Sequence, residues 1–254
     1  MVIDSHAHLE MVPFDRDRDQ VVRRAKDAGV EIIVTVGTTE ADCRKALEIT
    51  RRYPGVYAVI GIHPHEVKDI KEGTYDSLKE MAKHEKVVAY GEIGLDFFRN
   101  LSPRGTQIHR FGEQLELASE LGLPVVIHDR DAHRETMNLL KGWKGSRRGI
   151  IHCFSGDYPM ARQCIDLGFC ISIPGTVTFE KNEKLRAIVR ELPLESLLVE
   201  TDCPYLTPNP FRGKRNEPAY VIHTARKIAE IKGKTFEEVA AVTTGNAKAL
   251  FNIP

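Results

Sequence analysis

Short segments rich in valine and isoleucine recur along the chain, and a longer segment with the hydrophobic period of a helix follows each of them. This alternation predicts strands joined by crossover helices, and such connections make neighbouring strands parallel. The predicted strands are Val2–Ile3, Glu31–Val36, Val56–Ile62, Val87–Tyr90, Val125–Ile127, Ile150–Ile151, Phe169–Ile173 and Leu197–Val199.

Amphipathic helices are predicted after these strands, at Asp19–Ala28, Glu40–Arg52, Tyr75–His84, Thr106–Glu120, Arg134–Leu140, Pro159–Leu167, Lys184–Glu191 and Tyr220–Lys232. A terminal helix over Thr235–Phe251 is expected to pack on the outside. Eight strand–helix pairs in 254 residues predict an α/β fold, a (β/α)8 TIM barrel, which takes about 250 residues. An open doubly wound sheet is the alternative and explains less. No linker or repeat appears, so we expect a single domain over residues 1–254.

A long segment rich in proline and arginine, Cys203–Pro218, follows the eighth predicted strand. Its prolines are incompatible with a regular helix or a central strand, so we expect one loop. Loops of this length inside a compact domain are usually functional. The segment is therefore a candidate wall of a binding site.

The charge balance limits how the protein can bind a polyanion. The 36 basic and 36 acidic side chains give no net charge, so no general basic field exists and a local patch or bound cations must supply the attraction. The five cysteines show no C-x-x-C spacing, which suits a reduced cytosolic compartment. No apolar run reaches the roughly 18 residues of a membrane span, and the first residues lack the pattern of a signal peptide. We expect a cytoplasmic protein without a membrane segment.

Histidines and carboxylates follow five of the predicted strands at the point where each strand ends. Because the C-terminal ends of barrel strands open on one face, these side chains should meet in one mouth. Imidazole suits zinc, manganese or iron, and carboxylates also admit magnesium. We therefore predict a site for one or two divalent cations whose ligands are His6, His8, Glu92, His128, His152 and Asp202.

Each of these residues has a simpler interpretation when it is taken alone. A single histidine at a strand end, such as His128, is more often a hydrogen-bonded structural residue, and Glu92 alone could sit at a helix N-terminus. The H-x-H pair of His6 and His8 is a weak motif by itself, although alternate residues of an extended chain share a face. The joint pattern favours the metal site. Within it, Glu92 is the best candidate for a ligand shared by two cations.

Other residues near the predicted mouth are candidates for substrate contact. His63 follows the third strand, and Arg130 stands two residues beyond His128, where it could meet a substrate anion or pair with a nearby carboxylate. Arg215 belongs to a basic cluster with Arg212 and Lys214 in the long loop; such a run is usually solvated, but over a metal centre it would suit phosphate.

Three residue groups near these motifs have other interpretations. His65 fits a turn after proline better than a ligand position. The helical histidines, which we expect at the surface or in packing contacts, are His84, His109, His133 and His223. Cys153 should point away from the mouth if His152 points into it.

Several familiar catalytic motifs are missing from the sequence. It contains no phosphate-binding loop of the G-x-x-x-x-G-K-[ST] type, no G-x-G-x-x-G after a strand and no G-x-S-x-G elbow. Nucleotide hydrolysis by such a loop, hydride transfer and serine esterase chemistry therefore lack support.

Seven motifs, in order across nearly the whole chain, resemble the signatures of TatD-family metal-dependent deoxyribonucleases. They are Asp4–Leu9 (DSHAHL), Gly61–His65 (GIHPH), Gly91–Asp96 (GEIGLD), Pro124–Arg130 (PVVIHDR), His152–Gly156 (HCFSG), Glu200–Leu206 (ETDCPYL) and Arg212–Pro218 (RGKRNEP). The sequence departs from the usual pattern at Glu10, Phe97–Phe98 and Arg134, which bears on substrate preference rather than on metal binding.

The resemblance implies a barrel of the metal-dependent hydrolase superfamily with the six ligands named above. It also implies Mg²⁺-supported cleavage of DNA, often from a 3′ end, and a substrate role for His63. The expected substrate is single-stranded DNA or a 3′ end, and no obligate protein partner is evident. Mn²⁺ and Zn²⁺ are alternatives to Mg²⁺ for the two predicted cation positions.

The mechanism that we expect is hydrolysis of a phosphodiester by water with two cations. Asp202 is the expected general base, and His63, Arg130 and Arg215 are expected to contact the phosphate. The first cation would be held by His6, His8, Glu92 and Asp202, and the second by Glu92, His128 and His152.

Two alternatives to this function remain open from the sequence. The same scaffold could hydrolyse an amide, a lactone or an aminoacyl ester, since a fold does not fix its chemistry. Many amide-cleaving relatives carry a modified lysine where Glu92 stands, which favours phosphoester chemistry here. A non-enzymatic metal-binding protein is the other alternative.

Overall fold

A computed structural model of the protein describes residues 1–145 and 149–254. In these residues eight strands form one parallel sheet in which each strand pairs with the next along the chain. The strands are β1 (Val2–Ala7), β2 (Val30–Val36), β3 (Val56–Ile60), β4 (Val87–Asp96), β5 (Val125–Arg130), β6 (Gly149–Ile151), β7 (Cys170–Ile173) and β8 (Leu197–Val199).

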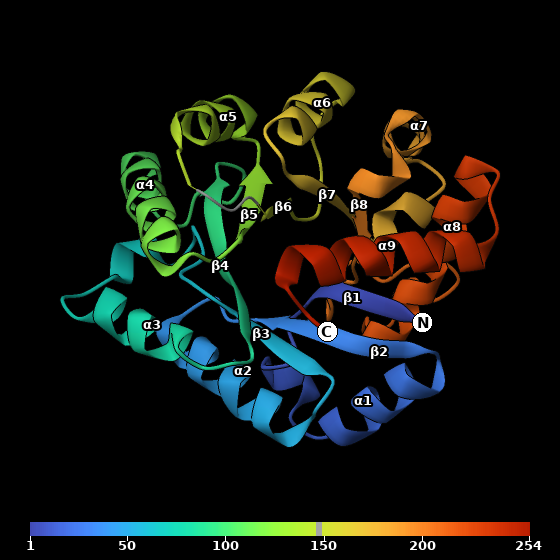
Figure 1. The fold of residues 1–254 in the computed structure, drawn as a ribbon, viewed down its shortest axis with the longest axis horizontal. Coiled ribbons are helices and arrows are strands. Elements are labelled where there is room, and N and C mark those ends of the chain that lie inside the picture. The colour runs from blue at the N-terminus through green and yellow to red at the C-terminus, as the bar shows by residue number, and fades with distance from the viewer. Residues whose placement is uncertain (146–148) are drawn as a thin grey trace.

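Helices surround the sheet on its outside (Figure 1). They are α1 (Arg18–Asp27), α2 (Glu40–Arg52), α3 (Thr74–Ala82), α4 (Arg104–Leu121), α5 (His133–Gly142), α6 (Tyr158–Asp166), α7 (Glu183–Glu191), α8 (Val221–Lys232) and α9 (Phe236–Phe251). Short 3-10 turns cover Val12–Phe14, Val67–Asp69, Gly175–Thr178, Leu194–Ser196 and Pro218–Tyr220. The predicted (β/α)8 TIM barrel is confirmed. Residues 203–217 carry no helix or strand, as expected for the long loop.

The barrel closes between β8 and β1 through backbone contacts at the ends of the two strands. Ala7 pairs with Cys203 in an isolated parallel bridge. The Asp202 amide donates to the His6 carbonyl at 2.9 Å, and the His8 amide donates to the Cys203 carbonyl at 2.9 Å. The closing seam therefore places the first and last candidate ligands of the sequence side by side.

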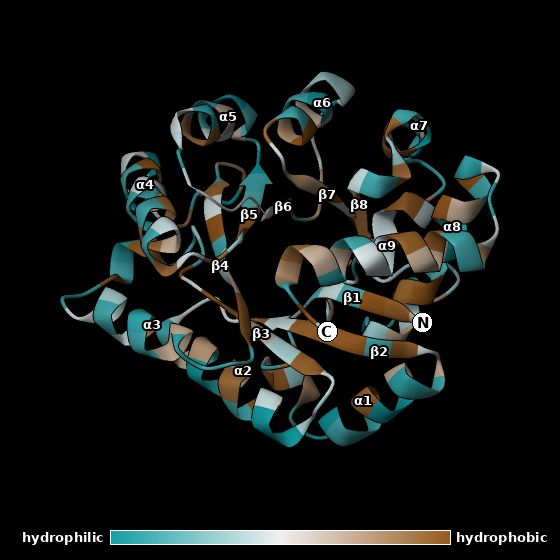
Figure 2. Cartoon of the chain, in the orientation of Figure 1, coloured by the Kyte–Doolittle hydropathy of each residue, from teal (hydrophilic) through white to brown (hydrophobic). Residues whose placement is uncertain are grey.

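Two apolar layers hold the barrel together. One lies between the strands and the surrounding helices, and Figure 2 shows the strands mainly in hydrophobic colours while the helices alternate. The other joins side chains such as Ile3, Val34 and Val126 from seven strands with Phe251 and Ile253, so it fills the barrel interior. α9 packs against α8, β1 and β8, and the residues at its end, Phe251 and Ile253, also cover one end of this interior, which the sequence did not indicate.

Three strands extend further than the sequence indicated. β1 runs to Ala7, β4 runs to Asp96 and β5 runs to Arg130, so several candidate ligands lie within strands rather than after them. The strand predicted over Val87–Tyr90 ended just before the first of the two glycines of β4, Gly91 and Gly94. A Cβ at Gly94, whose φ is +141°, would lie 2.0 Å from the His128 carbonyl oxygen of the neighbouring strand. The close approach of β4 and β5 is thus the reason for glycine here.

Replacing Gly94 with alanine is expected to lower the free energy of unfolding by about 2–4 kcal/mol, because the new Cβ collides with β5 and the backbone angle is strained. Gly112 in α4 is the matched control, since a Cβ there meets nothing within 4 Å. Its alanine variant should gain about 0.5–1 kcal/mol from helix propensity. Urea unfolding of both variants measures the difference. Equal stability of the two variants would contradict the packing argument.

None of the helices among the described residues combines the length and apolar character needed to span a lipid bilayer.

Candidate metal centre

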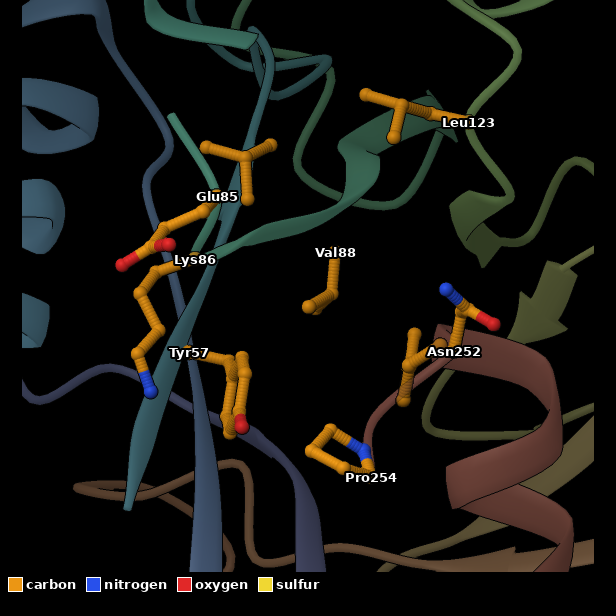
Figure 3. A pocket seen from close by; sticks show the side chains of 9 residues that line it. Tyr57, Glu85, Lys86, Val88, Leu123, Asn252 and Pro254 are labelled. Atoms are coloured by element: carbon orange, nitrogen blue, oxygen red, sulfur yellow. The ribbon is translucent and has the colours of Figure 1, made fainter. Parts of the chain in front are cut away.

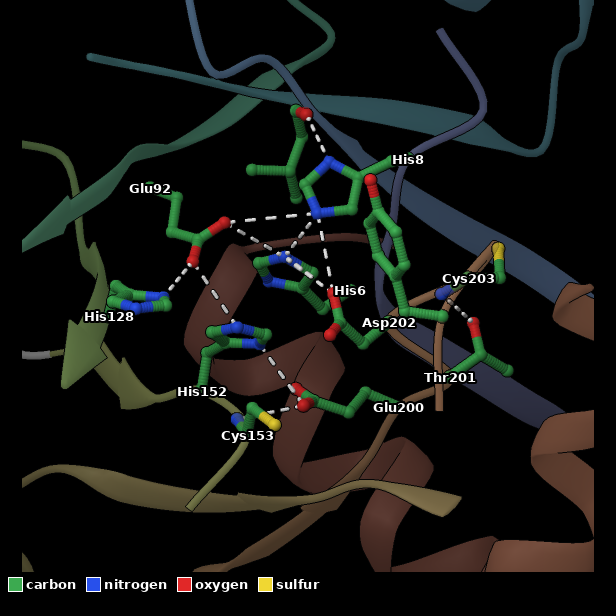
Figure 4. A network of polar contacts seen from close by, with 12 residues as sticks. His6, His8, Glu92, His128, His152, Cys153, Glu200, Thr201, Asp202 and Cys203 are labelled. Atoms are coloured by element: carbon green, nitrogen blue, oxygen red, sulfur yellow. Dashed lines mark hydrogen bonds and ion pairs between the residues drawn. The ribbon is translucent and has the colours of Figure 1, made fainter. Parts of the chain in front are cut away.

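The structure brings the six predicted ligands together at the C-terminal ends of the strands, around the carboxylate of Glu92 (Figure 4). The Glu92 side chain is only 3% exposed. Its Oε2 atom lies 3.3 Å from His6 Nε2 and 3.8 Å from His8 Nε2. One carboxylate oxygen therefore faces His6, which is in β1, and His8, which follows that strand.

The other oxygen of Glu92 faces a different set of histidines. Its Oε1 atom lies 2.6 Å from His128 Nδ1, 3.3 Å from His152 Nε2 and 3.5 Å from His63 Nε2. A carboxylate that presents each oxygen to its own group of imidazoles has the arrangement expected of a ligand shared by two cations.

Asp202 completes the first of these groups from the β8 side. Its Oδ1 atom lies 3.4 Å from His8 Nε2 and 3.9 Å from His6 Nε2. The Asp202 side chain is 15% exposed against 3% for Glu92, so it stands nearer to solvent. This position allows it to contact both a bound ion and an entering water.

The chemistry of the donor set fits divalent cations. His6 Nε2 and His8 Nε2 lie 3.3 Å apart, and the His6 and His152 rings stack with centroids 3.7 Å apart. Imidazoles this close in a buried site cannot all be in the cationic form, because their charges would repel one another strongly. Neutral imidazoles, in contrast, can share a metal cation. Imidazole and carboxylate together suit zinc, manganese or iron, and the carboxylates also admit magnesium.

The electrostatic environment keeps the central carboxylates ionised. Burial by itself raises the pKa of Glu92, but its electrostatic interactions with the surrounding histidines, His152 first, hold that pKa well below its usual value. The pKa of Asp202 is also lowered, because the contacts with His8 outweigh burial. Burial lowers the pKa of His63 to about 4 despite the nearby Glu92 charge. The centre thus combines ionised carboxylates with a neutral His63 at pH 7.

A second layer of carboxylates supports the histidines. Glu10 Oε1 lies 3.1 Å from His8 Nδ1, and Glu200 Oε1 lies 3.1 Å from His152 Nδ1. Partners of this kind orient ligating imidazoles and fix their tautomers. Neither role was predicted from the sequence, although Glu10 follows His8 by two residues and Glu200 precedes Asp202 by two. The expectation that the departure at Glu10 does not bear on metal binding was wrong, because Glu10 contacts a predicted ligand.

Asp96 holds His128 from the side opposite Glu92. Its Oδ2 atom lies 3.2 Å from His128 Nε2 and 2.8 Å from His65 Nε2. These contacts raise the pKa of His128 to about 9, although burial opposes the change. His65 does lie in a turn, as expected, but its ring also takes part in this carboxylate contact.

Replacing Glu200 with glutamine is expected to weaken metal binding about 10–100-fold, the usual effect of losing such a partner. The glutamine keeps the size of the side chain but loses the charge that faces His152 Nδ1. Glu195, which is exposed shortly before β8, gives a matched control in Glu195→Gln. Titration of the apoprotein with Zn²⁺ measures both affinities. An unchanged affinity in Glu200→Gln would remove Glu200 from the support of the centre.

The three predicted substrate residues are placed differently. His63 belongs to the cluster around Glu92. Arg130 is exposed beside it, with its guanidinium carbon 4.0 Å from the centre of the Phe98 ring. Arg215 is held by an ion pair with Asp17 at 2.7 Å. A phosphate contact by Arg215 would have to replace that pair.

The strand alternation on which the expectation for Cys153 rested does not continue to that residue. Its sulfur lies within 4.8 Å of ligand atoms of His152 and Glu200. The expectation assumed that strand alternation continues, but β6 ends at Ile151 and Cys153 has φ +46°. Burial raises the pKa of the Cys153 thiol well above its usual value, which makes it a poor nucleophile.

A separate pocket of about 400 Å³ lies at the opposite end of the barrel, near the start of β4 and the C-terminal residues (Figure 3). Tyr57, Lys86 and Val88 contribute to its wall. None of the candidate ligands lines it.

A parallel barrel with imidazoles and carboxylates gathered at its C-terminal strand ends is the architecture of a metal-dependent hydrolase. The sequence model of the family described as "TatD related DNase" matches residues 3–252. The chain belongs to this TatD family of metal-dependent hydrolases, and the resemblance seen in the motifs is confirmed.

Individual relatives match the chain along its full length. It is 46% identical to the "Uncharacterized metal-dependent hydrolase YabD" of Bacillus subtilis, covering 100% of both chains. It is 39% identical to the "3'-5' ssDNA/RNA exonuclease TatD" of Salmonella typhimurium, covering 99% of both. The solved structure of YJJV, a TatD homologue from Escherichia coli, superposes with a TM-score of 0.95 at 33% identity, covering 100% of this chain and 98% of that one.

Proposed function

We propose that this hydrolase cleaves phosphodiester bonds of DNA as a 3′–5′ exonuclease acting on single strands or 3′ ends. The observation that carries the proposal is Glu92, whose two oxygens face two separate groups of imidazoles. Two-cation sites of this kind suit in-line displacement at phosphorus. The relative named as a 3'-5' ssDNA/RNA exonuclease supports the same substrate class.

Two divalent ions would be held on the two sides of Glu92. We propose Mg²⁺ as the activating ion, with Mn²⁺ or Zn²⁺ as alternatives. The first would take His6, His8, Glu92 and Asp202, and the second Glu92, His128 and His152, on the distances given above. When bound, such ions lower the pKa of water and draw charge from the phosphoryl oxygens.

Asp202 is the proposed general base. Its carboxylate is ionised and lies closer to solvent than Glu92, so it can accept the proton that the attacking water loses. His8 Nε2 lies 3.4 Å from Asp202 Oδ1, so the two side chains are close enough to hold the same cation. The proton passes from the water to Asp202 as the water oxygen bonds to phosphorus. The bond between phosphorus and the 3′ oxygen of the preceding nucleotide breaks, and that oxygen takes a proton from solvent.

His63 and Arg130 are the proposed contacts of the substrate phosphate. His63 stands on the Oε1 side of Glu92, and its neutral ring can donate a hydrogen bond to a phosphoryl oxygen. Arg130 supplies a fixed positive charge at the exposed end of β5. Arg215 stays a predicted third contact, conditional on release from Asp17.

The proposal is tested by the dependence of cleavage on metal and strand. Oligonucleotides labelled at the 3′ or 5′ end, single-stranded and duplex, are incubated with the purified protein, and a panel of amides and lactones is assayed in parallel. We expect early loss of a 3′ label from single strands, abolition by EDTA and recovery with Mg²⁺ or Mn²⁺. Cleavage that is indifferent to EDTA, or turnover of amides and lactones alone, would contradict the proposal.

A further inference from the structure

Exposed aromatic side chains gather on the face that carries the candidate metal centre. Among the described residues the three most exposed are Phe98 (59%), Tyr205 (53%) and Tyr158 (41%). Phe98 follows β4, Tyr158 begins α6 after β6, and Tyr205 follows β8. All three therefore lie at the end of the barrel where the strands present the centre.

Phe98 and Tyr205 each lie close along the chain to a residue of that centre. Phe98 comes two residues after Asp96, whose carboxylate contacts His128 at 3.2 Å. The Tyr205 amide donates to the Asp202 carbonyl at 2.9 Å. Since β4 and β8 are four strands apart in an eight-stranded barrel, the two rings stand on opposite sides of the mouth.

The Phe98 ring also has the positively charged side chain of Arg130 over it. The guanidinium of Arg130 lies 4.0 Å from its centre, while more than half of the residue stays exposed to solvent. Scattered exposed apolar residues are common and need no explanation. An exposed ring beside an arginine at the edge of a nuclease site is different, because aromatic rings and positive charge are the two elements that bind unpaired nucleic acid.

We propose that Phe98 and Tyr205 are stacking platforms for bases on the two sides of the scissile phosphate, and that they select single strands. The inference rests on the proposed function. In a duplex both faces of each internal base are covered by neighbours, so only an unpaired base can stack on a protein ring. Because every base has a π-face, such platforms tolerate any base and either sugar.

Binding of a fluorescent single-stranded oligonucleotide tests the inference directly. We would use the Asp202→Asn background with Mg²⁺, so that the strand is cut slowly, and read anisotropy. Phe98→Ala and Tyr205→Ala are each expected to raise the Kd about 5- to 150-fold, the range for losing one stacked base. Phe98→Trp and Tyr205→Phe should restore it, because they keep a ring.

A matched control comes from the other end of the barrel. The Tyr57 ring also has a positively charged side chain over it, with Lys86 Nζ 4.1 Å from its centre, but Tyr57 lines the remote pocket. Tyr57→Leu should bind the oligonucleotide as the parent does. An oligonucleotide with abasic residues at its 3′ end should not distinguish Phe98→Ala or Tyr205→Ala from the parent, since it offers no base to stack.

The outcomes separate this inference from the function on which it rests. If the wild-type protein cuts single strands while both alanine variants bind the normal oligonucleotide as the parent does, the platforms are refuted and the nuclease function stands. If the alanine variants lose binding to abasic and normal strands alike, the rings do not act by stacking, and the inference fails. If the wild-type protein neither binds nor cuts single strands, both proposals fail together.

Discussion

Replacing Glu92 with glutamine is expected to lower kcat/KM for single-stranded DNA by about 10⁴-fold or more. A centre that loses its shared carboxylate forfeits several kcal/mol of transition-state stabilisation, and about 5 kcal/mol already corresponds to nearly four factors of ten. Steady-state cleavage of a 3′-labelled oligonucleotide at saturating Mg²⁺ measures the loss. Bound metal per chain should fall in parallel.

The physical reason is that glutamine has nearly the size of glutamate without its charge. The amide would turn one neutral oxygen towards some of the imidazoles and an N–H₂ group towards the others, so one of the two histidine groups would meet a donor in place of an acceptor. The five imidazoles within 4 Å of Glu92 would then lack the anion that they share.

Glu85→Gln is the matched control for this experiment. Glu85 is exposed just before the same strand and takes no part in the centre. It should keep wild-type activity and metal content. Activity in Glu92→Gln within about tenfold of that control would refute the central place given to Glu92, since a tenfold change corresponds to only about 1.4 kcal/mol.

Replacing Asp202 with asparagine is expected to slow turnover by about 10²–10⁴-fold while most of the bound metal is retained, because a positioned base contributes that much. The asparagine oxygen can still face His8, but it cannot accept the proton of the attacking water. Single-turnover cleavage beside metal analysis separates the two roles. A variant that loses its metal entirely would show that Asp202 acts first as a ligand.

Asp131→Asn gives the control that isolates the chemistry of Asp202. Both residues follow barrel strands and both adopt a left-handed backbone, with φ +54° at Asp131 and +53° at Asp202. Asparagine tolerates this conformation as well as aspartate does. Asp131 is exposed, and its variant should turn over normally. Near-normal turnover in Asp202→Asn as well would remove Asp202 from the mechanism.

The sequence was sufficient to predict the convergence of the candidate ligands, because barrel topology brings every strand end to one face. His6 and Asp202 lie 196 positions apart in the sequence, yet the seam between β1 and β8 joins their backbones by a hydrogen bond. A periodic pattern of strands and helices contains that information without any knowledge of side-chain contacts.

Features that depend on close packing between strands could not be read in the same way. The predicted strand stopped at Tyr90, but β4 continues to Asp96, and Gly91 and Gly94 stand where β5 leaves no room for a side chain. The alternation of side chains along a strand does not apply to Cys153, because its left-handed backbone turns the chain. Such local conformations are set by tertiary contacts rather than by residue period.

The supporting carboxylates were missed for another reason. Glu200 begins one motif and Glu10 directly follows another, and the histidines and Asp202 of these motifs were the residues interpreted as metal ligands. A single sequence does not distinguish a ligand from the residue that orients it. For Arg215 the basic cluster suggested phosphate, whereas pairing with Asp17 depends on α1 lying close to the long loop.

Anomalous diffraction from crystals grown with Mn²⁺ tests the central claim most directly. We predict two manganese peaks beside the Glu92 carboxylate, one on the side of His6 and His8 and the other on the side of His128 and His152. Peaks elsewhere in the barrel, or none beside Glu92 at saturating Mn²⁺, would contradict the account.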